Sequence, residues 1–173
     1  MNVIIINGSH RKNGNCEHFA SKAKEILARS HNVKVYTLID LHINYCSGCL
    51  QCEDGQKCLI DDDFSKILEP NLRMADLIIF ASPTYFNMPS AAMVNYIDRT
   101  NKMCNYFEEN EKKCLFYIVG QTDEDSIKDT YNCLHTYSEI MGMKEIMDPI
   151  ITVARMPEPV TQEIVSIIEK LSV

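Results

Sequence analysis

Short apolar runs rich in β-branched residues recur along the chain and alternate with longer helix-like segments. The apolar runs cover residues 3–7, 33–38, 76–82, 114–120 and 146–154. The first, third and fourth runs are apolar almost throughout, which is typical of strands buried on both faces of a sheet. The segments between the runs are long enough to be crossover helices, and we expect helices over residues 15–29, 62–74, 89–107, 124–141 and 159–171.

This alternation predicts an α/β fold with a doubly wound parallel sheet. The chain has 173 residues, of which 46% are hydrophobic, so it can bury one sizeable core but is short for two. We therefore expect a single domain over residues 1–173. Local signals mark two helix starts. The three aspartates at 61–63 are expected to cap a solvated helix end, and Pro159 suits the first turn of the last helix.

Charge and the N-terminal sequence argue against two classes of partner. The formal net charge is −7, and the Lys and Arg residues are scattered, so we expect no nucleic acid partner. The N-terminal apolar run is far too short for a signal peptide or a membrane span, so we expect no membrane and a cytoplasmic location. In that reducing compartment, eight cysteines indicate metal or redox chemistry more often than disulfides.

A polar loop, NGSHRKNGNC, follows the first apolar run at residues 7–16. Gly, Ser and Asn residues between a buried strand and a helix start expose backbone N–H groups, and the helix dipole adds partial positive charge. The side chains of Ser9, Asn13 and Asn15 can add hydrogen bonds, while Arg11 can add charge. The loop matches neither familiar nucleotide-binding spacing, so by itself it suits a phosphate cradle or an ordinary polar turn equally well.

A second loop with polar and aromatic residues follows the third apolar run. Pro83 stiffens the turn, Tyr85 and Phe86 offer flat apolar surface, and Asn87 can bind the polar edge of an aromatic ring, with Thr84 between them. Such an aromatic pair also occurs as simple core packing. In a sheet of flavodoxin-like order, however, ligands bind where the carboxyl ends of strands one and three meet. A phosphate loop and an aromatic loop at that edge together predict a site for flavin mononucleotide (FMN).

Four segments then carry a family resemblance. They read GSHRKNGN at 8–15, CSGCLQCEDGQKCLIDDD at 46–63, SPTYFNMPSAAM at 82–93 and IDR at 97–99. In these segments the chain resembles the NADPH-dependent FMN reductase-like branch of the flavodoxin superfamily, and its cysteine motif resembles that of the iron–sulfur flavoprotein members. The resemblance implies a five-stranded parallel sheet of order 2-1-3-4-5 with helices on both faces. It also implies bound FMN and a homodimer or homotetramer with the flavin near the subunit interface.

The resemblance further implies which residues bind FMN. The phosphate would be held by Ser9, Arg11, Asn13, Gly14, Asn15 and Cys16. The isoalloxazine would be lined by Pro83, Thr84, Tyr85, Phe86 and Asn87, with the loop from Gly120 approaching from the other side. Two positions depart from the family near the phosphate: His10 stands where Pro is usual and Cys16 where Thr is usual, so one hydroxyl contact is weakened or lost. Val94 stands where Lys is frequent, at an interface or substrate contact.

The segment CSGCLQCEDGQKC at 46–58, termed here the cysteine loop, holds four of the eight cysteines. Three cysteines at intervals of three can wrap one face of a 4Fe–4S cluster, and a turn at Gly55 would let the fourth complete the site. The metal ligands would then be Cys46, Cys49, Cys52 and Cys58. Free thiols are the equal alternative, because the same pattern occurs in the resembling family without a cluster. Zinc and disulfides are weaker readings, since zinc knuckles usually stand further apart.

The sequence thus predicts an FMN-dependent oxidoreductase. The flavin performs the redox chemistry, so no side chain is assigned a catalytic role. Without a cluster, the expected activity is an NAD(P)H-dependent reductase of small-molecule acceptors such as flavins, quinones, azo or nitro compounds. With a cluster, the expected activity is one-electron transfer with ferredoxin. A carrier without a substrate of its own and a zinc-stabilised binding module remain as rivals; the first would not oxidise NAD(P)H, and the second would be colourless.

Overall fold

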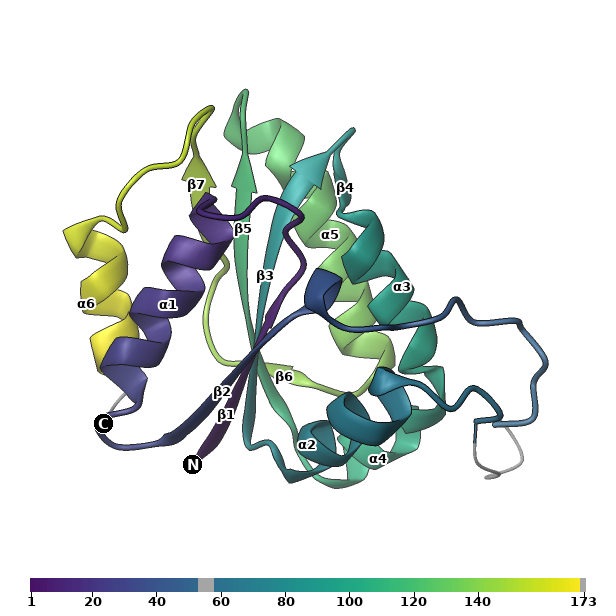
Figure 1. The fold of residues 1–173 in the computed structure, drawn as a ribbon. Helices are drawn as coiled ribbons and strands as arrows, with labels where there is room; N and C mark the ends of the chain where they lie inside the picture. Colours follow the sequence, from purple (N-terminus) through teal and green to yellow (C-terminus); the bar gives the residue numbers. More distant parts are fainter. Residues whose placement is uncertain (53–57, 172–173) are drawn as a thin grey trace.

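The computed structural model describes residues 1–52 and 58–171, apart from the side chains of residues 104, 105 and 108, and shows a parallel sheet between two layers of helices (Figure 1). Strands β1 (Asn2–Asn7), β3 (Leu77–Tyr85) and β5 (Lys113–Gly120) form its buried centre. Strand β2 (Asn32–Thr37) pairs with β1, while β6 (Lys144–Glu145) and β7 (Ile150–Val153) pair with β5. The order β2-β1-β3-β5-β6 confirms the predicted flavodoxin-like sheet.

Two positions of the sheet differ in detail from the prediction. The fifth strand, expected over 146–154, is present there only as β7, and a shorter strand, β6, precedes the expected range; β6 pairs with the start of β5 and β7 with its end. Pro149 lies between these two strands, and its missing N–H removes one ladder hydrogen bond. A short antiparallel strand, β4 (Met88–Pro89), pairs with the end of β3 and makes a hairpin at the aromatic loop.

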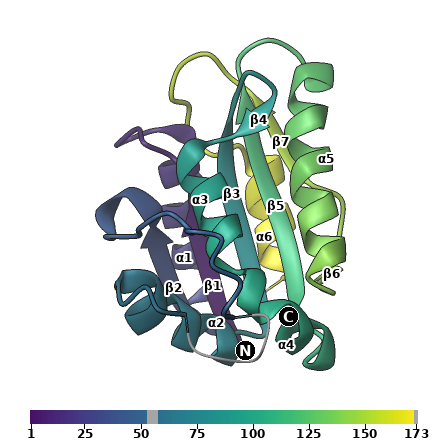
Figure 2. The same cartoon turned by 90° about the vertical axis from the view of Figure 1, so that its right-hand side faces the viewer.

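Helices cover both faces of the sheet (Figures 1 and 2). Helices α1 (Asn15–Leu27) and α6 (Gln162–Lys170) lie on one face. The other face carries the π-helical turn η2 (Phe64–Leu68), α2 (Glu69–Met74), α3 (Ala91–Arg99), α4 (Cys104–Glu109) and α5 (Glu124–Ile140). Successive residues of β1 enter opposite cores, Ile4 with Phe80 and Ile5 with Phe19. The central strands are therefore buried on both faces, as predicted.

Side-chain hydrogen bonds set helix boundaries that the apolar pattern did not reveal. The helix expected over 89–107 ends at Arg99 and continues as the 3-10 turn η3 (Asn101–Met103) and α4. At the break, the Thr100 hydroxyl donates to the Ile97 carbonyl at 2.7 Å and lies 3.0 Å from the Tyr137 hydroxyl. Such local bonds compete with the helical ladder.

The start of the last helix also differs from the prediction. Thr161 caps it by accepting the Ile164 N–H, so α6 begins at Gln162 and Pro159 lies before the helix rather than in its first turn. A 3-10 turn, η1 (Leu38–Asp40), ends the segment after β2. Among the helices of the described ranges, none is long and apolar enough to cross a membrane.

Candidate functional site

The polar loop after β1 and the aromatic loop after β3 meet at the carboxyl edge of the sheet, at the top of Figure 1. One cavity there is lined from the two loops by Ser9, Arg11, Gly14, Asn15, Cys16, Pro83, Thr84 and Tyr85. A second cavity of about 290 Å³ is lined by Thr84, Tyr85, Phe86, Asn87, Gln121, Thr122 and Ser126. The two cavities share Thr84, Tyr85 and Gln121, so they lie next to each other along the edge.

The N-terminus of α1 faces this depression. Gly14 is the N-cap residue and has no side chain, so no side chain caps the helix there. A Cβ at Gly14 would lie 3.1 Å from the Arg11 carbonyl oxygen and 3.3 Å from the Arg11 side chain, so the loop closes tightly around this glycine. The first-turn N–H groups and the helix dipole therefore suit an anion, while the Glu17 carboxylate of the same turn accepts the Asn13 N–H at 2.5 Å.

The structure argues against a side-chain contact to the phosphate for three of the predicted phosphate ligands. The Asn15 side chain is engaged elsewhere: its Nδ2 donates to the Met156 carbonyl at 3.3 Å, and its Oδ1 accepts the Glu158 N–H at 2.6 Å. The Cys16 thiol is buried, and this burial raises its pKa to about 12, so at neutral pH it is an uncharged core group. Asn13 does not line either cavity.

The loop after β3 is a tight hairpin with a strained tip. Phe86 and Asn87 have φ of 50° and 59°, the left-handed region that bulky residues rarely adopt. The Asn87 Nδ2 donates to Asp129 Oδ2 on α5 at 3.0 Å, which fixes the tip, and the Phe86 side chain is fully exposed. Within the described residues, the buried Thr84 hydroxyl oxygen has no hydrogen-bond partner.

The ends of β5 and β7 form a third wall of the first cavity. The sequence predicted only that a loop from Gly120 would approach the flavin. Four residues of this wall line the first cavity: Val119, Gly120, Gln121 and Ala154. In the sequence, only their position at the ends of strands indicates that they could contact a ligand. Ala154 donates its N–H to the Gly120 carbonyl at 2.8 Å, which joins these ends. A Cβ on Gly120 would lie 2.4 Å from Ile127 Cγ1, so only glycine allows β5 and α5 to approach this closely.

The cysteine loop projects away from the sheet edge, at the right of Figure 1. Cys46 and Cys49 are exposed, Cys52 and Cys58 are half-buried, and the turn predicted at Gly55 lies outside the described residues. Hydrogen bonds from the Gln51 backbone and the Ser47 side chain lower the pKa of Cys49. Over residues 1–52 and 58–171, no three His, Cys, Asp or Glu side chains are grouped to hold a metal ion.

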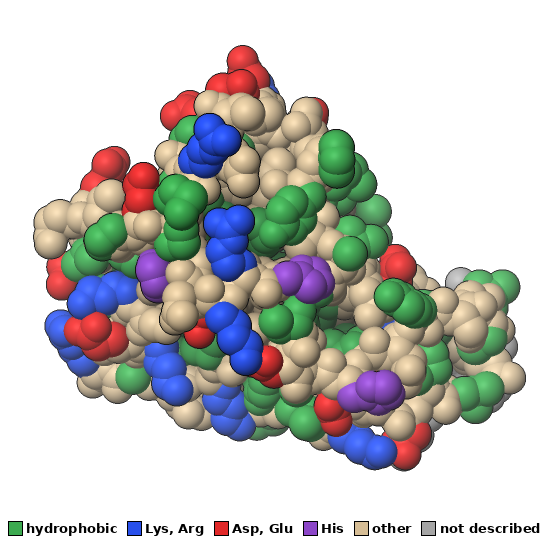
Figure 3. Space-filling view, turned by 45° about the horizontal axis from the view of Figure 1, so that its top comes forward, with side chains coloured by type: hydrophobic (Ala, Val, Ile, Leu, Met, Phe, Trp, Pro, Cys, Tyr) green, Lys and Arg blue, Asp and Glu red, His purple; other side chains and the backbone are tan. Residues whose placement is uncertain are grey.

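The donor set of the cysteine loop nevertheless suits a soft metal centre, because four thiols are its preferred ligands. Side chains of the hydrophobic class, which includes cysteine, gather on the projecting part of the molecule (Figure 3), and Leu50 in the loop and Tyr45 and Leu59 beside it are strongly exposed. The loop therefore combines thiols with an apolar surface.

One expectation about the end of this loop is wrong. The three aspartates at 61–63 were expected on a solvated helix end, but the Asp62 side chain is 0% exposed and pairs with Arg99. Burial opposes ionisation of Asp62, yet the Arg99 hydrogen bonds, together with N–H groups of Asn44 and Ser65, hold its pKa below the ordinary value. The sequence offered no direct signal for this pair, since its members are 37 positions apart.

Comparison with known proteins gives a family match. Residues 1–157 match the model of the family described as NADPH-dependent FMN reductase. An iron–sulfur flavoprotein of Methanocaldococcus jannaschii is 31% identical over 149 residues, which cover 86% of this chain and 77% of that protein. An iron–sulfur flavoprotein of Methanosarcina thermophila is 29% identical over 151 residues, with 86% and 78% covered.

Solved structures agree in fold. A WrbA-like flavodoxin from Agrobacterium tumefaciens superimposes with a TM-score of 0.64 at 15% identity, over 99% of this chain and 92% of that one. At this identity the likeness concerns the fold alone, and it matches the strand order described above.

Proposed function

This chain belongs to the NADPH-dependent FMN reductase family, and we propose that it binds FMN along the carboxyl edge of its sheet and uses NAD(P)H to reduce a small-molecule acceptor. The observation that carries this proposal is the pair of adjoining cavities lined by the loops after β1 and β3. A phosphate fits the corner beside Gly14, and a flat ring fits against Tyr85 and Phe86. The unpartnered Thr84 hydroxyl offers a hydrogen bond to such a ligand.

The chain supplies binding and orientation, while bound FMN supplies hydride and electron transfer. Backbone N–H groups of Asn15 and Cys16 would donate hydrogen bonds to the phosphate, and the Arg11 side chain would offset its charge. The side-chain amide of Asn15 and the thiol of Cys16 serve structure instead. Ser9 and Asn13 would shape the loop. Ser9 already does so, because its Oγ accepts the Arg11 N–H at 3.1 Å.

The hairpin and the β5 end would hold the ring. Pro83, Thr84, Tyr85, Phe86 and Asn87 would line one side, and Gln121 with Thr122 the other. The opening beside the exposed Phe86 favours planar acceptors that can stack, such as quinones, flavins, azo or nitro compounds. No side chain is needed as a proton donor at the reacting centre.

Anaerobic stopped-flow mixing tests this function. Protein loaded with FMN is mixed with NADPH or NADH, and loss of the oxidised flavin absorption is followed. Rapid bleaching by at least one nucleotide, followed by recovery when a quinone is added, is expected. If neither nucleotide bleaches the bound flavin, the reductase assignment fails.

A second candidate is an iron–sulfur flavoprotein that exchanges single electrons with ferredoxin. Its support is the set of four thiols in one loop and the names of the relatives. The ligands of a 4Fe–4S cluster would be Cys46, Cys49, Cys52 and Cys58. Iron and sulfide analysis of anaerobically purified protein decides between the candidates, because the cluster requires about four iron atoms per chain, whereas the reductase requires none.

A further inference from the structure

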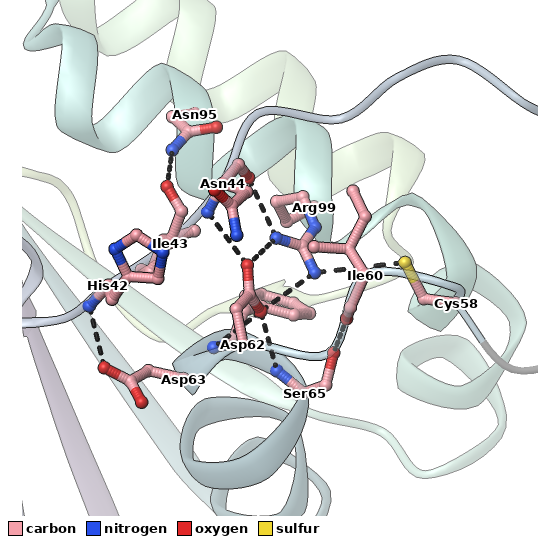
Figure 4. Close-up of polar contacts among 11 residues, drawn as sticks. His42, Ile43, Asn44, Cys58, Ile60, Asp62, Asp63, Ser65, Asn95 and Arg99 are labelled. Carbon is pink, nitrogen blue, oxygen red and sulfur yellow. Dashed lines mark hydrogen bonds and ion pairs between the residues drawn. The ribbon is translucent and has the colours of Figure 1, made fainter.

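The chain runs out into the cysteine loop after η1 and returns at η2, and both ends of this excursion meet at one buried ion pair (Figure 4). Arg99 Nη1 lies 2.5 Å from Asp62 Oδ2 and 2.8 Å from the Asn44 carbonyl, and Nη2 lies 3.1 Å from Asp62 Oδ1. Both charged side chains are at most 1% exposed. Because Asn44 stands two residues before Cys46, this guanidinium joins the outgoing chain to the returning chain.

The Asp62 carboxylate is also bonded by the backbone on both sides of the loop. It accepts N–H groups from Asn44 at 2.8 Å, from Phe64 at 3.1 Å and from Ser65 at 3.4 Å. The Arg99 guanidinium lies over the Phe64 ring, 4.9 Å from its centroid. A buried ion pair adds little stability over an apolar pair of the same volume, because both charges must be desolvated. Its distinctive property is a fixed geometry, set by the planar guanidinium fork.

The same guanidinium reaches the last cysteine, since Arg99 Nη2 lies 3.9 Å from Cys58 Sγ, within hydrogen-bonding range for sulfur. One cation thus contacts the segments that carry the first and the last thiol of the loop. We propose that Arg99 is a positioning residue for the cysteine loop, which fixes where Cys46 and Cys58 leave the protein surface so that the loop thiols bind one soft metal ion together. This role requires no flavin and goes beyond the proposed oxidoreductase activity.

Further contacts at the loop ends support this role. The His42 N–H donates to Asp63 Oδ2 at 2.7 Å, the Asp63 N–H donates to the His42 carbonyl at 3.1 Å, and Asn95 donates to the Ile43 carbonyl at 3.1 Å. These bonds fix the chain just outside the thiols. Cys46 and Cys49 themselves are exposed, so they remain accessible to a metal ion.

Helix α3 connects this anchor to the cofactor edge. At its N-terminus, the Ser90 hydroxyl donates to the Gly8 carbonyl at 2.6 Å and accepts the Met93 N–H at 3.2 Å. Arg99 is the last of its nine residues, so the helix separates the two anchors by about 13 Å. A single rigid element therefore carries a contact to the phosphate loop at one end and the cysteine-loop anchor at the other.

Cobalt(II) is a suitable probe, because thiolate ligation gives it a charge-transfer absorption that requires no enzymatic activity. The purified, reduced chain and two variants are titrated anaerobically with cobalt(II). Arg99→Lys keeps the charge but lacks the fork. The double variant Asp62→Asn with Arg99→Met removes both charges, so that no unpaired charge is buried, and keeps an acceptor for the Phe64 N–H. Lys112→Met is the matched control, since Lys112 is a buried cation that binds the Arg73 and Ala75 carbonyls instead.

The expected result is one thiolate-ligated cobalt per wild-type chain, with affinity reduced about tenfold or more in Arg99→Lys and in the double variant. Lys112→Met should bind cobalt like the wild type. Circular dichroism spectra and thermal unfolding show whether each variant is folded. If the double variant is folded but binds cobalt more weakly, the loss of binding comes from the position of the loop and not from loss of the fold.

The proposal is overturned if the folded Arg99 variants bind cobalt as tightly as the wild type, or if the wild type binds none through its thiols. The FMN content of the same samples is measured separately. Failure of FMN binding would remove the proposed function without affecting the cobalt result, so the two ideas fail independently.

Discussion

Gly120 sets the distance between β5 and α5 beside the cofactor edge. In Gly120→Ala, the new Cβ would lie 2.4 Å from Ile127 Cγ1, a contact that forces strand and helix apart. We expect a loss of about 2 kcal/mol in unfolding free energy, the usual cost of overpacking a core. Urea unfolding measures this loss. In an Ile127→Ala background the clash disappears, so Gly120→Ala should then cost much less; an equal cost in both backgrounds would contradict the steric explanation.

His135 provides a pH-dependent contact between α5 and β6. Its Nδ1 lies 2.6 Å from Glu145 Oε1, and Glu145 also accepts the Tyr131 and Ser138 hydroxyls, while Glu139 faces the other ring nitrogen at 3.6 Å. The hydrogen bond that the His135 ring donates to Glu145 raises the pKa of His135 above its ordinary value, although partial burial opposes the shift.

Because the folded pKa is the higher one, this contact contributes stability below the unfolded pKa, about 6.5, and loses it as the pH rises through the folded pKa. The unfolding free energy of the wild type should therefore exceed that of His135→Gln by more at pH ~5.5 than at pH ~8.5. Denaturant unfolding at both pH values measures the difference. A difference that grows with pH would contradict the assignment.

The β3–β4 hairpin combines backbone strain with the proposed ring-binding surface. Phe86 has a φ of 50° and a fully exposed side chain, so nothing in the folding of one chain requires a phenylalanine there. Phe86→Gly should relieve strain of about 1 kcal/mol and raise the unfolding free energy. The same change should weaken FMN binding, because one aromatic wall is lost.

Equilibrium unfolding and FMN titration of the same preparation test the hairpin. Met88→Ala is the control: it removes an exposed apolar side chain from the hairpin at a residue with no left-handed backbone, so it should not stabilise the fold. If Phe86→Gly lowers stability and leaves FMN affinity unchanged, the hairpin is not a strained binding element.

Elements with continuous apolar runs could be predicted from the sequence, and those fixed by side-chain bonds could not. The central strands and their order follow from burial on both faces. The helix break at Thr100 and the start of α6 at Thr161 depend on hydroxyl bonds whose partners the pattern does not reveal. The division of the fifth strand around Pro149 likewise required knowledge of which residues of β5 it pairs with.

The candidate site was also predictable from the sequence only in part. Its two loops follow strands one and three, so strand order alone predicts that they meet. Distant segments are joined by the Asp62–Arg99 ion pair and by the hydrogen bonds of the Asn15 side chain to the backbone of residues 156 and 158. Only the folded chain reveals these contacts. Polar residues that appear available for a ligand in the sequence are in these cases bonded within the protein.

We propose that the protein forms a homodimer or homotetramer. Tyr85, Phe86 and Met88 leave a large apolar area exposed beside the cofactor edge, which is typical of an interaction surface. Light scattering coupled to gel filtration should give two or four times 19.8 kDa. Met88→Asp should shift the mass toward the monomer, whereas a monomeric wild type would contradict the proposal.

We propose that FMN binds with its phosphate at the N-terminus of α1 and its ring at the β3–β4 hairpin. Fluorescence titration of the apoprotein with FMN and with riboflavin, which lacks the phosphate, tests this binding mode. Because two or more charge-assisted hydrogen bonds are lost, riboflavin should bind at least about 100-fold more weakly. Equal affinity for the two flavins would rule out this binding mode, since the loop after β1 would then have no role in binding.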